Sequence, residues 1–480
     1  MYKYLGSRSY YIRINDRIEN YTHISNAMSE GHTIDKTAVL GLLMKNYALS
    51  TRTLVEGIER TPWMLRARDT NDWEQIELPQ HGNIMLNPEV IAKEMKQRLQ
   101  SEALTFLEGK ARIGVLLSGG MDSRIVAAIL KQLQESGEYS GDVVALTWGL
   151  DDSRDVIYAQ NIAERFNWEF LHFPLNADVL MDNIFIAADR GAEYSPIHLH
   201  AMHQISKTPG LDGVLAGSYG DSIGRGEYSG LHVSKLPDIL DKNLNHFALM
   251  LRSAEKKALA NIKIDIKQDL AFFPGRSEIA YREIEMQMYY MRRQLNSCME
   301  VIDDLIPLYQ MFGSPDVYGY MWSLDPACRT DQNYEYLLKI LPGNLLDIPW
   351  ARTGTNFNQS SEEPIDSFSK SNNHYGKWLR KDLRNFILDE IGSGALQSLG
   401  IFNNKSLAMW SRYWGNANRL KADRLDEKMA WLASLSLFVK KYNIQGIDTP
   451  SNYSFSDCLS QTNALVHTSL YHYALRVLKR

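Results

Sequence analysis

Short apolar runs alternate with amphipathic stretches through the middle of the chain, and the first such pair is the clearest. Residues 113–117 form a continuous apolar run, which is typical of a buried parallel strand. Residues 118–120, Ser-Gly-Gly, interrupt that run. Beyond them, apolar residues recur at helical spacing, at Ile125, Val126, Ile129, Leu130 and Leu133. The pattern predicts a strand, a glycine turn and a helix, with Asp122 or Ser123 capping the first helical turn.

The same alternation continues further along the chain and indicates a parallel sheet covered by helices. Three more strands are predicted, at residues 141–148, 168–173 and 212–216. Helices are predicted around them, at residues 88–108, 155–166, 177–188 and 196–206. Strands that alternate with helices in this way favour an α/β fold with a parallel sheet. The pattern of residues 231–330 is mostly helical.

The beginning of the chain has a different pattern. Residues 10–14 are β-prone, and residues 35–47 have the spacing of a short helix. A chain of 480 residues also exceeds what one hydrophobic core usually serves. We therefore expect a small strand-rich domain at residues 1–87 and a larger α/β domain at residues 88–480.

Composition narrows the class of protein. A hydrophobic content of 44% with 23% charged residues is typical of a soluble globular protein, and a net charge of −5 gives no reason to expect nucleic-acid binding. The cysteines are Cys298, Cys328 and Cys458, without a CxxC pair. This spacing favours reduced thiols in the cytoplasm and argues against a zinc or iron–sulfur site. Neither an apolar signal core nor a stretch that could span a bilayer is present, so we expect no membrane partner.

A glycine turn between a strand and a helix suits phosphate binding. Glycine lets the backbone approach the oxyanions, while the free N–H groups and the positive end of the helix dipole face them. No lysine follows the glycines of residues 118–123, so the common phosphate-loop pattern G-x-x-x-x-G-K does not fit. The alternative interpretation is an ordinary glycine turn in a fold that binds no nucleotide.

The motif S-G-G-x-D-S at residues 118–123 resembles the pyrophosphate loop of the ATP pyrophosphatases, which make AMP and pyrophosphate. Residues 348–354, 378–384 and 399–402 are similar to later segments of the asparagine synthetase and β-lactam synthetase family. The resemblance implies an adenine nucleotide α-hydrolase-like synthetase domain with a helical C-terminal part. It also implies that the protein uses ATP and Mg2+.

The resemblance further implies which residues hold ATP. The phosphates would lie on the first loop, at Leu117, Ser118, Gly119, Gly120, Asp122 and Ser123. Thr147 and Trp148 end the second strand, where ligands of parallel sheets bind, so the nucleotide base could rest there. The family carries an S-x-D segment after this strand, matched here by Ser153 and Asp155. Trp148 as a plain core residue is nearly as good an interpretation.

A second loop, residues 217–222, resembles the G-E-G-x-D-E loop of asparagine synthetases, with Gly217 and Asp221 matching. Three family residues are replaced, by Ser218, Tyr219 and Ser222. We expect nucleotide contacts from Gly217, Ser218 and Tyr219. Because Mg2+ on a triphosphate prefers one or two carboxylates, Asp122 and Asp221 are the predicted metal ligands. The alternative for Asp221 is a turn aspartate in a glycine-rich loop.

Other candidate residues follow from the same resemblance. The family places a lysine before the helix at residues 378–384, where it neutralises charge that develops during the reaction. Lys370 is the predicted catalytic lysine, beside Asp122 and Asp221, and Lys377 is the second choice. Residues 193–195 would border the acceptor pocket. His198, His200 and His203 are interpreted as packing or solvated residues rather than metal ligands.

Residues 51–58 resemble part of the glutaminase domain that precedes the synthetase domain in asparagine synthetases. Those glutaminases use an N-terminal cysteine whose own α-amine serves as the base. Here position 2 is Tyr2, and no cysteine precedes Cys298. We therefore expect a degenerate domain that does not hydrolyse glutamine. The ammonia or amine would then be free, come from a partner, or belong to the substrate.

These features predict a cytoplasmic, ATP-dependent carbon–nitrogen ligase. It would activate the carboxylate of a small molecule or peptide as an acyl-adenylate, for attack by ammonia or an amine. One alternative is an intramolecular cyclase of the β-lactam synthetase or lasso-peptide cyclase type. Others are a non-catalytic nucleotide-binding relative and a pyrophosphate-loop enzyme acting on tRNA, against which the net charge and the missing CxxC argue.

Overall fold

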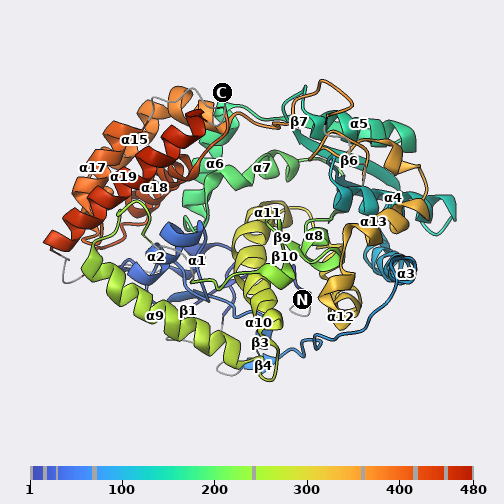
Figure 1. Cartoon of the computed structure of the whole chain (residues 1–480), viewed down its shortest axis with the longest axis horizontal. Coiled ribbons are helices and arrows are strands. Elements are labelled where there is room, and N and C mark those ends of the chain that lie inside the picture. The colour runs from blue at the N-terminus through green and yellow to red at the C-terminus, as the bar shows by residue number, and fades with distance from the viewer. Residues whose placement is uncertain are drawn as a thin grey trace.

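The computed structural model describes most of the chain (Figure 1). The described ranges are 4–13, 19–28, 31–67, 73–240, 245–357, 363–414, 420–447 and 452–477. Tyr2 and Ile14, which entered the sequence predictions, lie outside them. Among the described residues, no helix combines the length and the apolar character needed to cross a bilayer.

A five-stranded parallel sheet lies at the centre of the larger part of the molecule. Its strands are β5 (Arg112–Leu116), β6 (Asp142–Gly149), β7 (Glu169–Pro174), β8 (Gly213–Ala216) and β11 (Leu308–Gln310). Every neighbouring pair is parallel, so the predicted α/β fold is confirmed. The four predicted strands are present within a few residues. β11 was missed, because three residues inside a mostly helical stretch carry too little periodicity to stand out.

The strand order is β11-β8-β5-β6-β7, and it determines where a ligand can bind. From β5 the chain moves outward through β6 to β7, then returns to the other side of β5 as β8. The order therefore reverses between β5 and β8, where Ile113 pairs with Gly213. In open α/β sheets, the loops at the carboxyl ends of two such strands diverge and leave a crevice.

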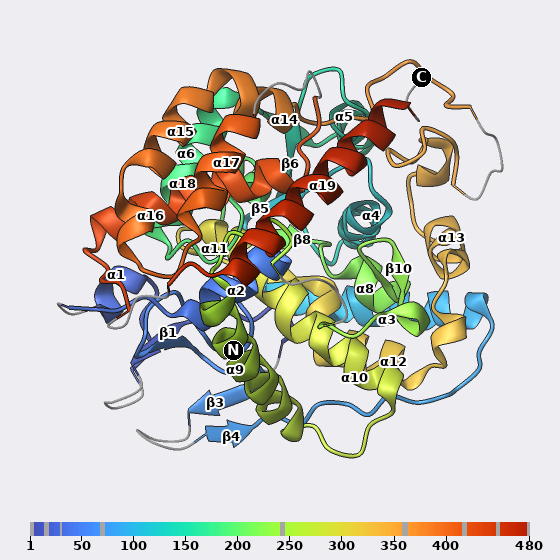
Figure 2. The ribbon, with the colours of Figure 1, turned by 60° about the vertical axis from the view of Figure 1, so that its left-hand side comes forward.

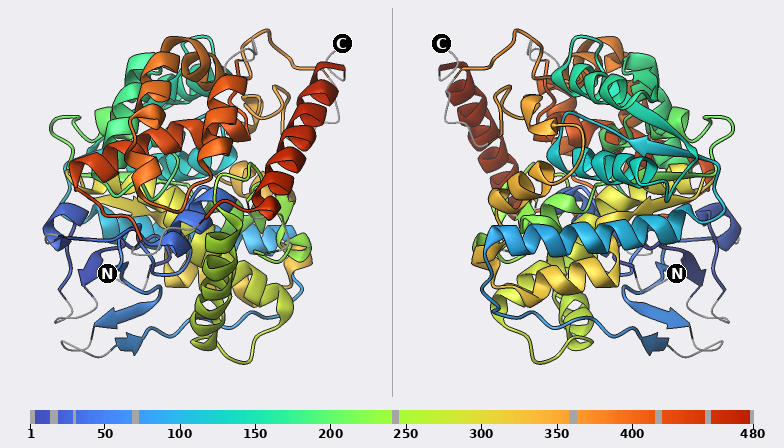
Figure 3. Two further views of the ribbon diagram at one scale, coloured as in Figure 1. Left: turned by 90° about the vertical axis from the view of Figure 1, so that its left-hand side faces the viewer. Right: turned by 90° about the vertical axis from the view of Figure 1, so that its right-hand side faces the viewer.

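Helices alternate with these strands along the chain, and the sequence predicts the first four of them. They are α3 (Pro88–Leu107), α4 (Met121–Glu135), α5 (Arg154–Phe166), α6 (Ala177–Asp189) and α13 (Asp331–Lys339). α4 packs on β5 and β8 through its apolar residues, all of which are buried, and α5 packs on β6 and β7. α3 and α13 lie together against α4, and the right-hand view of Figure 3 shows α3 crossing the molecule.

Two predicted details are wrong. The helix expected at 196–206 is broken into η1 (Pro196–Leu199) and α7 (Met202–Ile205), because His200 between them has φ 45°. A non-glycine residue with positive φ cannot continue a right-handed helix. Helix α4 is capped by neither Asp122 nor Ser123, since Gly120 is its N-cap and contributes no side-chain hydrogen bond.

The first part of the chain forms two small antiparallel pairs. They are β1 (Tyr11–Arg13) with β2 (Ile58–Arg60), and β3 (Leu65–Ala67) with β4 (Trp73–Gln75). Two helices accompany them, α1 (Ile24–Ala27) and α2 (Lys36–Lys45), and α2 packs on α9 (Arg252–Ala271). The domain boundary between residues 87 and 88 stays a prediction.

The remaining elements are mostly helical, as predicted (Figure 2). After β8 come α8 (Gly220–Gly224), β9 (Glu227–Tyr228), β10 (Leu231–His232) and η2 (Val233–Lys235). α10 (Glu278–Glu285) runs through the π-helix η3 (Met286–Asn296) into α11 (Ser297–Asp303). η4 (Met311–Gly313), α12 (Pro315–Ser323), η5 (Pro326–Cys328) and η6 (Leu345–Asp347) surround α13 in the sequence. The C-terminal elements are α14 (Tyr375–Lys377), the π-helix η7 (Trp378–Asp382), α15 (Arg384–Gly392), α16 (Ala395–Ser398), α17 (Asn404–Tyr413), α18 (Arg424–Lys441) and α19 (Phe455–Val477).

Candidate active site

The first loop joins β5 to α4 at the reversal of strand order. Its polar atoms bond to one another: the Ser118 N–H donates to Ser123 Oγ at 3.1 Å, and the Gly120 N–H donates to Ser118 Oγ at 3.1 Å. The first-turn N–H groups of α4 have no intrahelical acceptor, and the Gly120 N-cap supplies none from a side chain. Such a helix start is a ready anion site, since the dipole adds to the free donors.

Hydrogen bonds from neighbouring segments stabilise this loop. The Asp155 carboxylate accepts a hydrogen bond from the Gly119 N–H, which opposes the rise in its pKa that burial causes. The buried Arg124 guanidinium donates to the carbonyl oxygens of Gly119 at 3.0 Å and Leu345 at 2.9 Å. A Cβ on Gly119 would lie 2.6 Å from Ala351 Cβ, so only glycine fits there. The predicted S-x-D segment therefore contacts the loop. The contact of Arg124 with the loop was not predicted.

The second loop, between β8 and α8, lies directly on the start of α4. A Cβ on Gly217 would lie 2.9 Å from the Asp122 carbonyl carbon, and one on Gly220 would lie 2.4 Å from Asp122 Oδ1. The two glycines thus allow the closest approach between the loops. Because of this approach, the carboxylate at the start of α4 meets the one on α8.

The predicted metal ligands, Asp122 and Asp221, are neighbours. Burial, and next the charge of Asp221, raise the pKa of Asp122 well above its usual range, while Arg225 opposes the shift. Asp122 Oδ1 is buried and has no hydrogen-bond partner among the described residues. A buried acidic oxygen without a donor, beside a second carboxylate, is a suitable ligand set for a hard divalent cation. The residues present therefore fit Mg2+.

Arg225 was not predicted, and it modifies this ligand set. Its guanidinium contacts Asp221 directly and lies 2.6 Å from Asp331 on α13. The side chain of Asp221 remains 47% exposed, whereas that of Arg225 is 2% exposed. The Arg225 guanidinium therefore neutralises part of the charge of Asp221. Of the two carboxylates, Asp122 is the one with an oxygen that lacks a hydrogen-bond partner among the described residues.

A cavity of about 340 Å³ opens beside the two loops. Seven of the predicted nucleotide contacts line it, namely Ser118, Gly120, Asp122, Ser123, Trp148, Gly217 and Ser218. Four do not line it, namely Leu117, Gly119, Thr147 and Tyr219. The Thr147 hydroxyl donates instead to the Leu117 carbonyl at 2.8 Å, and the buried Tyr219 hydroxyl donates to the Leu5 carbonyl at 3.2 Å.

The far wall of the cavity comes from elements that the sequence could not place. His198 and His200 lie on one side, and residues of η3 and α11 lie on the other. Burial lowers the pKa of His198 to about 4 and that of His200 to about 3, so both imidazoles are neutral at pH 7. His203 does not line the cavity. No group of three or more potential metal ligands of the His, Cys, Asp and Glu types occurs in the described part of the chain.

Comparison with known proteins agrees with this geometry. Residues 94–284 match the family model described as asparagine synthase. This stretch contains both loops and the strands that carry them, and the match supports an ATP-using activity of the synthetase or ligase type. The cavity wall from residue 286 onward lies outside the matched stretch.

Solved structures similar to this chain include a tRNA thiolase and an NMN synthetase. One is a U34-tRNA thiolase, NcsA, from Methanococcus maripaludis with its 4Fe–4S cluster, at 13% identity and TM-score 0.26, covering 76% of this chain and 92% of that chain. The other is NMN synthetase from Francisella tularensis, at 13% identity and TM-score 0.21, covering 46% and 93%. Scores this low do not define the fold, which the five-stranded parallel sheet itself establishes. No curated protein matches the sequence.

Lys370, the predicted catalytic lysine, lies outside the matched stretch but close to it in space. Its neighbour Ser369 pairs with Ser153, and the Leu150 N–H donates to the Asn372 carbonyl at 3.0 Å. The segment is therefore held at the carboxyl end of β6. Lys370 is exposed and does not line the cavity, and the second choice, Lys377 on α14, is exposed as well.

Residues 193–195 were expected beside the acceptor pocket, but none of them lines the cavity. Glu193 Oε2 instead accepts from Arg60 Nε at 3.0 Å and from Arg293 at 2.8 Å. All three side chains are buried. The Glu193 carboxylate, on the segment after α6, therefore links β2 to η3 and does not face a substrate.

Proposed function

We propose that this protein is an AMP-forming carbon–nitrogen ligase that activates a substrate carboxylate with ATP and does not hydrolyse glutamine. The observation that carries the proposal is the pairing of Asp122 with Asp221, beside the free N–H groups of α4 at the reversal of strand order. The family match supports the use of ATP, and residues 1–297 contain no cysteine that could act as a glutaminase nucleophile.

In the proposed reaction, residues 118–123 bind the β- and γ-phosphates through backbone N–H groups and the Ser118 and Ser123 hydroxyls. Asp122 and Asp221 would hold Mg2+, which when bound polarises phosphoryl oxygens and offsets charge on the pyrophosphate. Trp148 lines the cavity where the nucleoside would lie. Lys370, on the segment beside β6, would approach the reacting phosphate when substrates are bound.

The chemistry follows from the leaving groups. A carboxylate does not react with an amine at neutral pH, because oxide would have to leave. The substrate carboxylate therefore attacks the α-phosphorus, the bond to the bridging oxygen breaks, and pyrophosphate leaves. The resulting acyl-adenylate has a good leaving group. An amine or ammonia then attacks its carbonyl carbon, AMP leaves, the nitrogen loses a proton, and an amide remains.

Asp122→Asn tests the proposal, because it removes the negative charge while keeping the shape of the side chain. We expect substrate-dependent pyrophosphate release to fall at least about 100-fold, with the loss of charge stabilisation around the phosphates. Glu135→Gln, an exposed change at the other end of the same helix, is the matched control and should leave the rate unchanged. Equal rates for Asp122→Asn and wild type would contradict the assignment.

The contact between Arg225 and Asp221 favours a second candidate, a relative that binds nucleotide without turning it over. In that case the Arg225 guanidinium would pair with the carboxylate that a metal-binding enzyme leaves free for its metal. Measurable ATP binding without AMP formation, for any carboxylate and amine supplied, would favour this candidate over the ligase.

A further inference from the structure

The part of the cavity opposite the two loops, called the chamber below, has uncharged walls. Six of its wall residues come from the elements opposite the loops: His198, His200, Tyr290, Gln294, Cys298 and Met299. Of the described side chains that line the whole cavity, Asp122 is the one carboxylate, neither lysine nor arginine is present, and burial keeps the two imidazoles neutral. A ligand in this chamber meets aromatic, thioether, thiol and amide groups.

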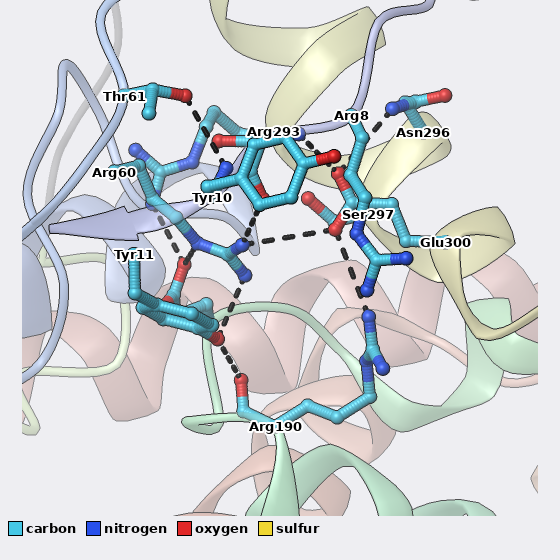
Figure 4. A network of polar contacts seen from close by, with 12 residues as sticks. Arg8, Tyr10, Tyr11, Arg60, Thr61, Arg190, Arg293, Asn296, Ser297 and Glu300 are labelled. Carbon is cyan, nitrogen blue, oxygen red and sulfur yellow. Dashed lines mark hydrogen bonds and ion pairs between the residues drawn. The ribbon is translucent and has the colours of Figure 1, made fainter. Parts of the chain in front are cut away.

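Charged side chains do occur on the same helices, but they are used elsewhere. Arg293 donates to Glu193 and to the Arg52 carbonyl at 2.7 Å, on the side of η3 that faces the beginning of the chain. Glu300 on α11 accepts from the Ser9 N–H at 2.8 Å and lies 3.7 Å from Arg60. Figure 4 shows the Arg60 guanidinium directed toward Glu300. None of these charges lines the cavity.

The polar groups that remain in the chamber are fixed and neutral. His200 Nδ1 lies 2.8 Å from the Tyr375 hydroxyl, and its ring stacks on Trp148 with centroids 6.0 Å apart. Its φ of 45° is an uncommon conformation for a residue other than glycine, and such strain persists where the surroundings impose it. His200 is therefore a positioned hydrogen-bonding group and not a counter-charge.

These walls discriminate among carboxylic acids by charge. A free α-amino acid such as aspartate would bring an ammonium group and a second carboxylate into the chamber. Burying a charge without a partner costs several kcal/mol, which the chamber offers no residue to offset. An acid whose other groups are amides or hydrocarbon would not meet this cost.

We infer, on the basis of the proposed ligase function, that the acceptor is a carboxylic acid whose remaining groups inside the chamber carry no charge. Two sources share this chemistry: a free acid with an apolar body, and an acidic side chain within a peptide, where amides replace the ammonium and α-carboxylate. Gln294 and His200 are the specificity-determining residues, since they supply the neutral polar contacts.

ATP–pyrophosphate exchange with a matched pair of acids tests this inference. L-Aspartate and N-acetyl-L-aspartate α-amide have the same reacting carboxylate and differ in the charges beside it. We expect kcat/KM to be at least about 100-fold higher for the blocked acid, given the cost of unpaired buried charge. 3-Phenylpropionate distinguishes the sources: exchange above that of the blocked aspartate indicates an apolar free acid, and exchange below it indicates a peptide.

Exchange with free aspartate equal to or above that with the blocked acid would overturn the inference while leaving the ligase function intact. Bound ATP with no exchange for any acid would overturn the ligase function, and the inference with it. A pair of variants adds a second test. Gln294→Arg places a cation in the chamber and should reduce the preference for the blocked acid at least about tenfold, through KM for aspartate. Gln294→Met, of similar size and also uncharged, removes a polar contact from both acids alike and should lower both rates while keeping the preference. Equal preferences in the two variants would contradict the role of Gln294.

Discussion

Asp122 has the most constrained surroundings of the candidate site residues. It is the second residue of α4, its Oδ1 is buried without a partner among the described residues, and two glycines of the next loop approach it. Gly217 lies against its backbone and Gly220 against its side chain. The position of the carboxylate therefore depends on the absence of a Cβ at both glycines.

Gly220→Ala follows from this geometry. The new Cβ would lie 2.4 Å from Asp122 Oδ1, so the carboxylate must move, while alanine is acceptable to the helical backbone of α8. A displacement of about 1 Å at a reacting group can cost about 100-fold in rate. We expect kcat/KM for ATP–pyrophosphate exchange to fall about 10- to 100-fold, with a higher Mg2+ requirement.

Gly392→Ala is the matched control, since its Cβ would meet nothing within 4 Å. It should leave exchange unaltered. If both alanine variants behaved like wild type, Asp122 would not need its observed position, and the metal assignment would lose its main support.

At the scale of elements, helix α10 is fastened to its surroundings by one buried acid. The Arg329 guanidinium donates to both oxygens of Glu283, at 2.6 and 2.8 Å, and Trp322 Nε1 donates at 3.1 Å. His81 lies 3.3 Å from the same carboxylate. Burial alone would raise the pKa of Glu283, but Arg329 and His81 outweigh it and lower the pKa to about 2. The contacts of Glu283 with Arg329, Trp322 and His81 thereby connect α10 with η5, α12 and the segment before α3.

A pKa below that of the unfolded chain makes this pair sensitive to acid. Its contribution to the free energy of unfolding is complete above pH 4.5 and is lost as the pH falls toward 2, by about 3 kcal/mol. Glu283→Gln leaves Arg329 buried without its counter-charge and should cost about 3–5 kcal/mol at pH 7. Urea unfolding at pH 7, 4 and 2.5 should show this difference shrinking as the pH falls.

Glu94→Gln provides the comparison, because Glu94 forms an exposed i,i+4 pair with Arg98. Its effect should stay within about 0.5 kcal/mol at every pH. A difference between wild type and Glu283→Gln that did not change with pH would exclude a depressed pKa for Glu283.

At the scale of the whole molecule, a buried ionic network joins the beginning of the chain to the helices behind the cavity. Arg60 on β2 lies 3.0 Å from Glu193 and 3.7 Å from Glu300, and its guanidinium lies over the Tyr11 ring. The Tyr11 hydroxyl donates to the Arg190 carbonyl at 2.7 Å, at the end of α6 (Figure 4). The N-terminal strands are thus tied to α6, η3 and α11.

Glu193→Gln should therefore weaken the whole molecule and not one local contact. It removes the counter-charge of Arg60 and Arg293, which stay buried, so we expect a loss of about 3–5 kcal/mol in the free energy of unfolding. Asp189→Asn, which disrupts the exposed pair with Lys441, should cost less than about 1 kcal/mol. Similar losses for the two variants, measured by chemical denaturation, would contradict a structural role for the network.

Local patterns in the sequence determined the four central strands, their helices and the glycine turn at residues 118–123. An apolar run or a helical repeat acts over a few residues, and a turn between them is defined by its own glycines. The pairing of Asp122 with Asp221 was also accessible, because the carboxyl ends of neighbouring parallel strands share one edge of the sheet.

Only the tertiary structure decided what surrounds those residues. Arg124 and Arg225 beside the loops, the ion pairs of Glu193, the break at His200 and the neutral far wall all join segments distant in the chain. Such contacts depend on how elements pack, and neither the residues themselves nor their spacing specifies the partner. The sequence by itself therefore determined where a nucleotide can bind, whereas the packing of η3 and α11 against the sheet decided the chamber for the acid.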